Sequence, residues 1–118
     1  MNHLLTEYPR LVEEQKKVSP ELPEWDETPP FVEAIQLLSQ NLSDTVKFIE
    51  NDCTPEQLVW MSVIASRVAK NLKNKGFTDA MRKAATKFSD KIEGYNVIEC
   101  IDEAESIIND KTSKTETN

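Results

Sequence analysis

The chain has 118 residues, which is enough for one hydrophobic core and too few for two ordinary domains. Hydrophobic residues make up 38% and charged residues 30%, as in a folded soluble domain. The chain contains only two glycines, so tight hairpins and glycine-rich phosphate-binding loops are not expected. The net charge of −7 disfavours nucleic acid as a partner and favours basic proteins.

Five helices are predicted in chain order, and the first covers residues 4–18. Its apolar residues are Leu4, Leu5, Tyr8, Leu11 and Val12, while Pro9 leaves its start open because proline is tolerated best in the first helical turn. Residues 19–28 (SPELPEWDET) are predicted to form a linker, because each X-Pro step favours extended backbone over helix.

The second helix is predicted to begin at Thr28-Pro29, with threonine as N-cap and proline at the first helical position. One apolar stripe continues from there to about Glu50, which predicts a single helix. Asn41 and Ser43 are the places where it could be kinked or divided.

The third helix has the best start signal in the chain, the run Thr54-Pro55-Glu56-Gln57. It supplies an N-cap threonine, a first-position proline and a capping-box glutamine. Gly76 is the predicted C-cap of this helix, because glycine adopts a left-handed conformation at little cost.

The last two helices are predicted over residues 78–88, with Thr78 as cap, and over residues 96–108. The polar sequence that follows predicts a single helical domain over residues 1–110 and a disordered tail over residues 111–118. No stretch alternates apolar and polar residues over the length of a strand. The expected fold class is therefore all-α, a compact bundle or stack of about five helices.

Catalytic and metal-binding patterns are not found in the sequence. His3 is the only histidine, so a Cys-His or Ser-His nucleophile would have to recruit a residue near the N-terminus. There is no HExxH motif, no spaced set of Cys and His, and no calcium loop. We therefore expect a protein that is not an enzyme and that uses no cofactor or metal.

The expected location is the cytoplasm. No apolar run approaches the roughly 20 residues that span a bilayer, and residues 1–10 lack the basic start and apolar core of a secretory signal. Cys53 and Cys100 lie far apart without a CxxC spacing, which favours two reduced thiols. A disulfide between them would require their close approach.

Charged residues are segregated along the chain into an acidic, a basic and a second acidic block. Residues 20–56 hold nine acids and one base, residues 67–91 hold eight bases and two acids, and residues 93–110 hold six acids and no base. The basic block spans two predicted helices and suggests a helix-turn-helix DNA-binding protein. The flanking acidic blocks oppose the positive field that phosphate binding needs, so a solvated face, or pairing with the protein's own acidic helices, is favoured.

Two tryptophans are candidate binding residues. Trp25 lies between Glu24 and Asp26 in the proline-stiffened linker, where it either folds back over the bundle or forms an exposed aromatic anchor. Trp60 lies inside the third predicted helix and is expected in the core.

Three runs, ETPPFVEAIQLL, FIENDCTPEQLVWMS and AMRKAATKFSDKIEGYNVIECIDEAESII, resemble bacterial immunity proteins of polymorphic toxin systems, in particular those of contact-dependent growth inhibition. The likeness covers roughly residues 27–108 and depends on the overall character of the sequence and on the helix boundaries in these runs. It implies cytoplasmic neutralisation of a cognate toxin, commonly a nuclease. No site residue is carried over, because such families diversify at the surfaces that face the toxin.

The resulting hypothesis is an immunity protein that occupies the cleft of a basic toxin, with carboxylates standing in for substrate phosphates. The expected partner-binding residues are Glu24, Trp25, Asp26 and Glu27, followed by Glu50, Asp52 and Glu56. The C-terminal acids form a competing face: Glu99, Asp102, Glu103 and Glu105. Two alternatives stay open, a module that dimerises through its second and third helices and the disfavoured DNA-binding protein.

Overall fold

The computed structural model describes the backbone of residues 4–117 and the side chains of residues 4–109. In this part of the chain there are seven α-helices, one short 3-10 helix and no strand, so the all-α prediction is confirmed and the expected number of helices was too low. The elements are α1 (Leu4–Lys16), the 3-10 helix η1 (Trp25–Glu27), α2 (Pro29–Ser39), α3 (Leu42–Asn51), α4 (Pro55–Val63), α5 (Ala65–Leu72), α6 (Lys75–Lys87) and α7 (Val97–Thr117).

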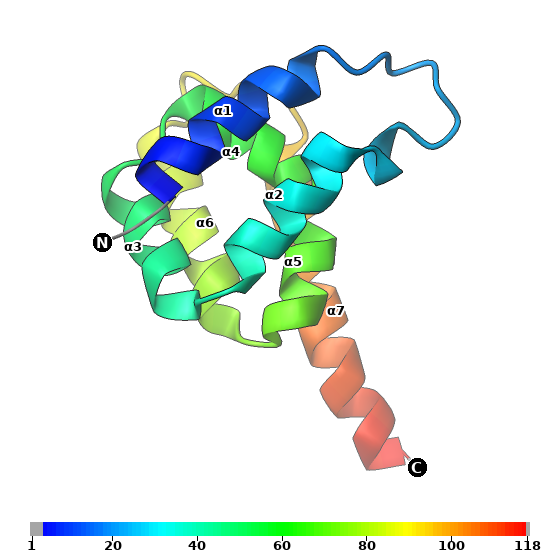
Figure 1. Ribbon diagram of the computed structural model, residues 1–118. Helices are drawn as coiled ribbons and strands as arrows, with labels where there is room; N and C mark the ends of the chain where they lie inside the picture. The colour runs from blue at the N-terminus through cyan, green and yellow to red at the C-terminus, as the bar shows by residue number, and fades with distance from the viewer. Residues whose placement is uncertain (1–3, 118) are drawn as a thin grey trace.

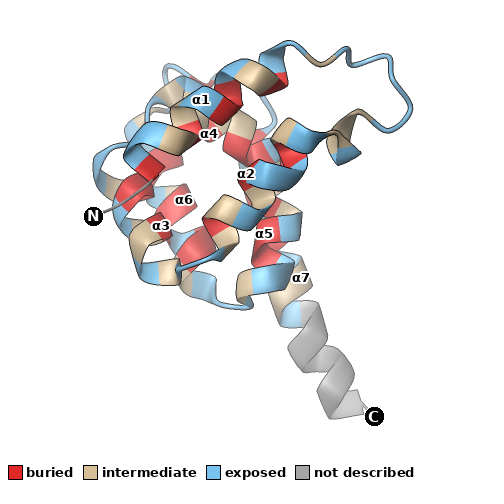
Figure 2. Ribbon diagram, viewed as in Figure 1, coloured by how far each residue is buried: buried red, intermediate tan, exposed pale blue. Residues whose placement is uncertain are grey.

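The helices pack around one hydrophobic core to form a compact globule with a radius of gyration of 14.0 Å. The principal contacts join α5 to α7, α3 to α6 and α1 to α2 (Figure 1). Buried residues from α1 to α7 face the interior (Figure 2), and the largest include Tyr8, Phe31, Phe48, Phe77 and Met81. Burial of these side chains is the main source of stability, because each contributes on the order of 2 kcal/mol.

Two expected helices are each divided in two. The second ends at Ser39, and α3 restarts after Asn41, whose side chain accepts a hydrogen bond from the Asp44 amide as an N-cap. The division therefore lies at one of the two residues that the sequence indicated. The third is interrupted at Ile64, which is buried and leaves helical geometry with φ −110° and ψ 9°.

The capping box of the third expected helix is present as predicted. The Thr54 side chain accepts from the Gln57 amide at 3.2 Å, and the Gln57 side chain accepts from the Thr54 amide at 3.0 Å. The start of the first helix, which Pro9 left open in the sequence, lies at Leu4, so Pro9 is inside α1. Proline lacks the amide that would bond the carbonyl of Leu5, a residue exposed to water.

The turn between α5 and α6 differs from the prediction. The left-handed residue that ends α5 is Lys73, with φ 54°, and Gly76 lies in the first turn of α6. Thr78 is buried inside that helix and is not its cap. Asn74 is the N-cap, because its side chain accepts from the Gly76 amide at 2.8 Å.

The last helix begins at Val97, directly after Asn96, as the sequence predicted. The packing of side chains is described only as far as Asn109. The polar tail expected at 111–118 lies outside the residues whose side chains are described and stays a prediction.

Candidate functional site

The linker between α1 and α2 folds back onto the bundle at Trp25. The ring of Trp25 is half-buried and meets the ring of Phe31 edge-on, with centroids 5.1 Å apart. Of the two alternatives that the sequence left open, the structure therefore shows the covering role. Trp25 therefore positions the linker, and the linker presents side chains on either side of Trp25 to solvent.

Arg67 of α5 binds both the main chain and the side chain of the next linker residue, Asp26. One guanidinium nitrogen donates to the main-chain carbonyl of Asp26 at 2.9 Å, and another forms an ion pair with its carboxylate. Thr28 adds a third tie, because its hydroxyl donates to the carbonyl of Trp25 at 2.7 Å. The η1 turn is therefore fixed to the bundle by aromatic packing and by hydrogen bonds.

Glu24 and Glu27 lie on either side of this fixed turn, and both are exposed. Neither forms an ion pair with any residue that the structure describes. When acidic residues on a fixed turn bind a cation, only their side chains lose conformational freedom, because the backbone is already ordered. The linker thus presents two unpaired carboxylates on a rigid base, which we name the linker face (Glu24 and Glu27).

The other predicted acids lie elsewhere and are largely engaged. Glu50 of α3 pairs with Lys83 at 3.4 Å, and Glu56 of α4 pairs with Lys16 at 2.8 Å. Asp52 is the C-cap of α3 and is exposed. The seven predicted residues therefore lie on the linker, on α3 with its C-cap and on α4, and two of the three acids outside the linker are paired with cations of the same chain.

Four of the eight bases in the basic block pair with acids of the same chain, which is one of the two interpretations that the sequence favoured. Besides Arg67 and Lys83, Arg82 of α6 bonds Asp102 and Glu105 of α7, each at 2.7 Å, and both carboxylates raise the pKa of Arg82. Lys75 adds a longer pair with Glu105 at 3.7 Å. These pairs reduce the positive field that DNA would meet and also engage half of the competing C-terminal acidic face.

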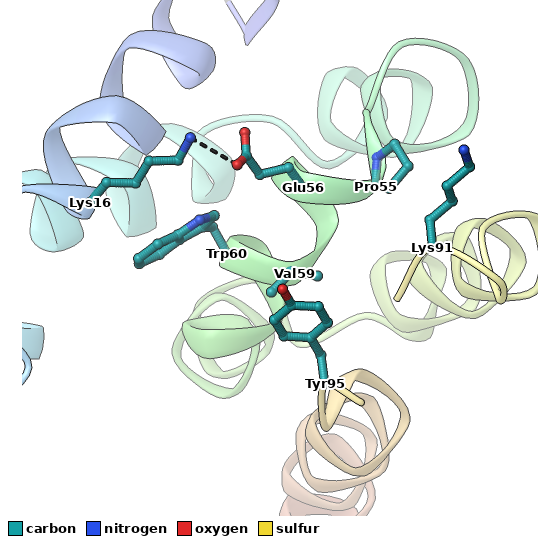
Figure 3. Close-up of a pocket in the computed structure, with 7 residues that line it drawn as sticks. All are labelled: Lys16, Pro55, Glu56, Val59, Trp60, Lys91 and Tyr95. Atoms are coloured by element: carbon teal, nitrogen blue, oxygen red, sulfur yellow. Dashed lines mark ion pairs between the residues drawn. The ribbon is translucent and has the colours of Figure 1, made fainter. Parts of the chain in front are cut away.

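A groove beside α4 was not predicted. It has a volume of about 520 Å³ and is lined by Lys16, Pro55, Glu56, Val59, Trp60, Lys91 and Tyr95. In Figure 3 the Tyr95 ring points toward α4, with Trp60 on one side and Lys91 on the other. We name it the α4 groove. The signal in the sequence was the extra width of the apolar stripe at Val59, which makes α4 apolar on more than one face.

Trp60 is only half-buried, so its expected place in the core is confirmed in part. Its ring packs at a tilt against Phe31, with centroids 6.3 Å apart, and its remaining surface lines the α4 groove. Trp25 and Trp60 thus contact the same phenylalanine, which connects the linker to the wall of the groove.

The cysteines are both free thiols. Cys53 is buried, and this burial raises its pKa to about 12 despite the opposing charge of Lys87. Among residues with described side chains, no group of three or more His, Cys, Asp or Glu could hold a metal ion. His3, the one candidate base, lies outside the described residues.

Comparisons with known proteins give no match among protein-family models, curated proteins or solved structures. Within the described part of the chain, none of the helices is both long and apolar enough to cross a membrane.

Proposed function

We propose that this chain is a cytoplasmic immunity protein without catalytic activity, which binds and neutralises a basic protein toxin. The linker face (Glu24 and Glu27) makes the first contacts. The carboxylates take the places that substrate phosphates would occupy in the toxin's cleft, which suits a toxin that is a nuclease.

The observation that carries this proposal is the fixed and unpaired state of the linker face. Most acids elsewhere in the predicted set are paired with cations of the same chain, whereas Glu24 and Glu27 are exposed and unpaired among the described residues. Trp25 and Asp26 hold the turn in place, so these two predicted residues act by positioning. A basic partner meets two charges carried on a backbone whose position is set before the partner arrives.

Electrostatics would then act mainly on the rate of encounter. Opposite potentials raise association rates by about tenfold or more at low salt, and screening by added salt removes that gain. Carboxylates already paired inside the molecule contribute less, because a partner would first have to displace the internal cation.

The experiment starts from the reading frame immediately upstream of this chain. Where that frame encodes a large protein, its C-terminal domain is expressed with and without this chain. Protection of growth and a 1:1 complex are the expected results. Stopped-flow association is then measured against salt concentration for Glu24→Gln/Glu27→Gln, which should bind about fivefold more slowly at low salt with a weaker salt dependence.

The matched control is Glu99→Gln/Glu103→Gln, which removes the same charge from the exposed C-terminal acids. It should associate at the rate of the unchanged chain. A slower rate in the control and an unchanged rate in the linker variant would assign binding to the C-terminal face. Failure of the chain to protect growth would refute the immunity function.

A further inference from the structure

Helix α4 is apolar on two faces, and the bundle covers one of them fully and the other only in part. Leu58 and Met61 are fully buried against the core. Val59, Trp60 and Val63 follow the helical spacing of three and four residues along the opposite face, where Val63 is 43% exposed. A surface helix normally turns polar residues to solvent, so this face is a candidate for contact with another molecule.

The α4 groove continues this face toward the loop before α7. Tyr95 stands there with 61% of its surface exposed, opposite Val59 and Trp60 (Figure 3). Aromatic side chains that are half-covered at the edge of an apolar groove are typical of binding hot spots. The groove therefore fits a large aliphatic side chain.

Two lysines line the α4 groove, and they determine which charge a bound group should carry at its edge. Lys16 is already paired with Glu13 at 3.0 Å and with Glu56 at 2.8 Å. Lys91 is exposed and forms no ion pair with any residue in the described part of the chain. The available charge is therefore positive, and the fitting occupant is an aliphatic residue with a neighbouring carboxylate. A basic partner does not have this chemistry.

The chain itself carries such a segment in Pro20–Pro23 of the linker, which we name the linker knob. Leu22 is 48% exposed between two prolines, and Glu21 precedes it directly. The knob is held in turns by bonds from the Leu22 amide to the Ser19 carbonyl and from the Trp25 amide to the Leu22 carbonyl, each 3.2 Å. Figure 1 shows this linker looping out from the bundle.

We propose that two copies of the chain form a symmetric dimer in which Leu22 of each copy enters the α4 groove of the other. Glu21 then faces Lys91 of the partner copy. The linker leaves the bundle from the end of α1, and Lys16 at that end lines the groove. The linker knob and the α4 groove both lie near the C-terminal end of α1. A two-fold axis therefore lets the two equivalent contacts form together, and the assembly is then complete as a dimer.

The test is the mass of the chain alone by light scattering, from micromolar to millimolar concentration, with no toxin present. The mass is expected to rise with concentration from the monomer value of 13.5 kDa toward twice that value. Leu22→Ser should raise the dimer dissociation constant at least about tenfold, because one buried leucine side chain is lost from each contact.

A charge exchange then tests the orientation. Glu21→Lys and Lys91→Glu should each weaken the dimer, whereas the double variant should restore it because the pair is rebuilt with opposite signs. Lys70→Glu is the matched control, at an exposed position of α5, and should leave the dimer unchanged. A monomer at every concentration would overturn the proposal, as would a dimer that none of these changes affects. Neither outcome depends on the immunity function.

Discussion

The hydroxyl of Tyr8 donates a hydrogen bond to the main-chain carbonyl of Gln57 at 3.3 Å, and this bond ties α1 to the capping box of α4. The ring of Tyr8 is fully buried and meets Phe48 of α3 edge-on at 5.7 Å between centroids. One side chain therefore connects three helices, and it does so as a neutral phenol.

The first prediction concerns alkaline pH. Burial, followed by the nearby Cys53, holds the pKa of Tyr8 well above its ordinary value of 10.0, and burial raises that of Cys53 from 9.0 to about 12. The folded protein keeps these protons after the unfolded chain has released them. The free energy of unfolding should therefore be level below about pH 8 and fall as the pH rises above 9, as urea titrations at several pH values would show.

The control for this prediction is Tyr8→Phe. It should cost about 1 kcal/mol at neutral pH through the lost hydrogen bond to Gln57. Above pH 10 its stability should fall less steeply than that of the unchanged chain, because the tyrosine share of the proton release is gone. Equal slopes would mean that Tyr8 does not resist ionisation in the fold.

Local signals in the sequence were sufficient for the fold class and for the starts of α2, α4 and α7. Thr54 and Gln57 form their capping box because the bonds involve residues three apart, which the sequence displays directly. The break at Ile64 has no such signal, since neither proline nor glycine is present there. It accompanies the burial of Ile64 and Ala65 against the core, which depends on how distant helices pack.

The candidate site was less predictable because charge pairing is a tertiary property. The acids at 24, 26, 50 and 56 look equivalent in the sequence, yet Arg67 and Lys83 engage two of them from across the fold. Tyr95 gave no periodic signal, because it lies in the loop before α7. Its place beside Trp60 follows from the packing of α4 and α7.

The second prediction concerns thiol reactivity. Only the thiolate attacks alkylating reagents, and burial leaves very little thiolate at Cys53 at neutral pH. Cys100 is half-buried, and its pKa is raised chiefly by burial, which a side-chain hydrogen bond with Ser62 partly offsets. Mass spectrometry after a pulse of iodoacetamide should find Cys100 modified first. Comparable labelling of both in the folded protein would contradict the burial of Cys53.

The third prediction is that Arg67→Gln loosens the linker more than it lowers global stability. The pair with Asp26 is largely solvated, with side-chain exposures of 44% and 31%, so its loss should cost no more than about 1 kcal/mol. The amides of Glu27 and Thr28, bonded to Glu24 and Trp25 at 3.0 and 3.3 Å, should exchange faster with deuterium.

Lys70→Gln is the matched control, because it removes an exposed cation from the same helix, α5, without touching the linker. Its linker amides should exchange as in the unchanged chain. Equal exchange in both variants would show that Trp25 and Thr28 fix the turn without Arg67. Arg67→Gln should also bind a basic partner more slowly, because Glu24 and Glu27 would then be presented on a mobile segment.

The two proposals share the linker, which predicts competition between them. The linker knob lies next to Glu24, so a partner on the linker face would collide with a second copy at Leu22. Adding an inactivated toxin domain to the concentrated chain should therefore convert the dimer into a 1:1 complex, observable by light scattering. A stable complex of two chains with two toxins would show that the surfaces are independent.

The last prediction isolates a backbone effect at the edge of the α4 groove. Gly94 has φ +93°, a conformation that side chains disfavour, although a Cβ there would meet no atom within 4 Å. Gly94→Ala should therefore lose about 1 kcal/mol, or about 5 °C in Tm, from backbone strain alone. Gly94→Asn should lose less, because asparagine tolerates positive φ better. A Gly94→Ala variant as stable as the unchanged chain would mean that the loop has a different backbone conformation, and the neighbouring Tyr95 would then occupy a different position at the α4 groove.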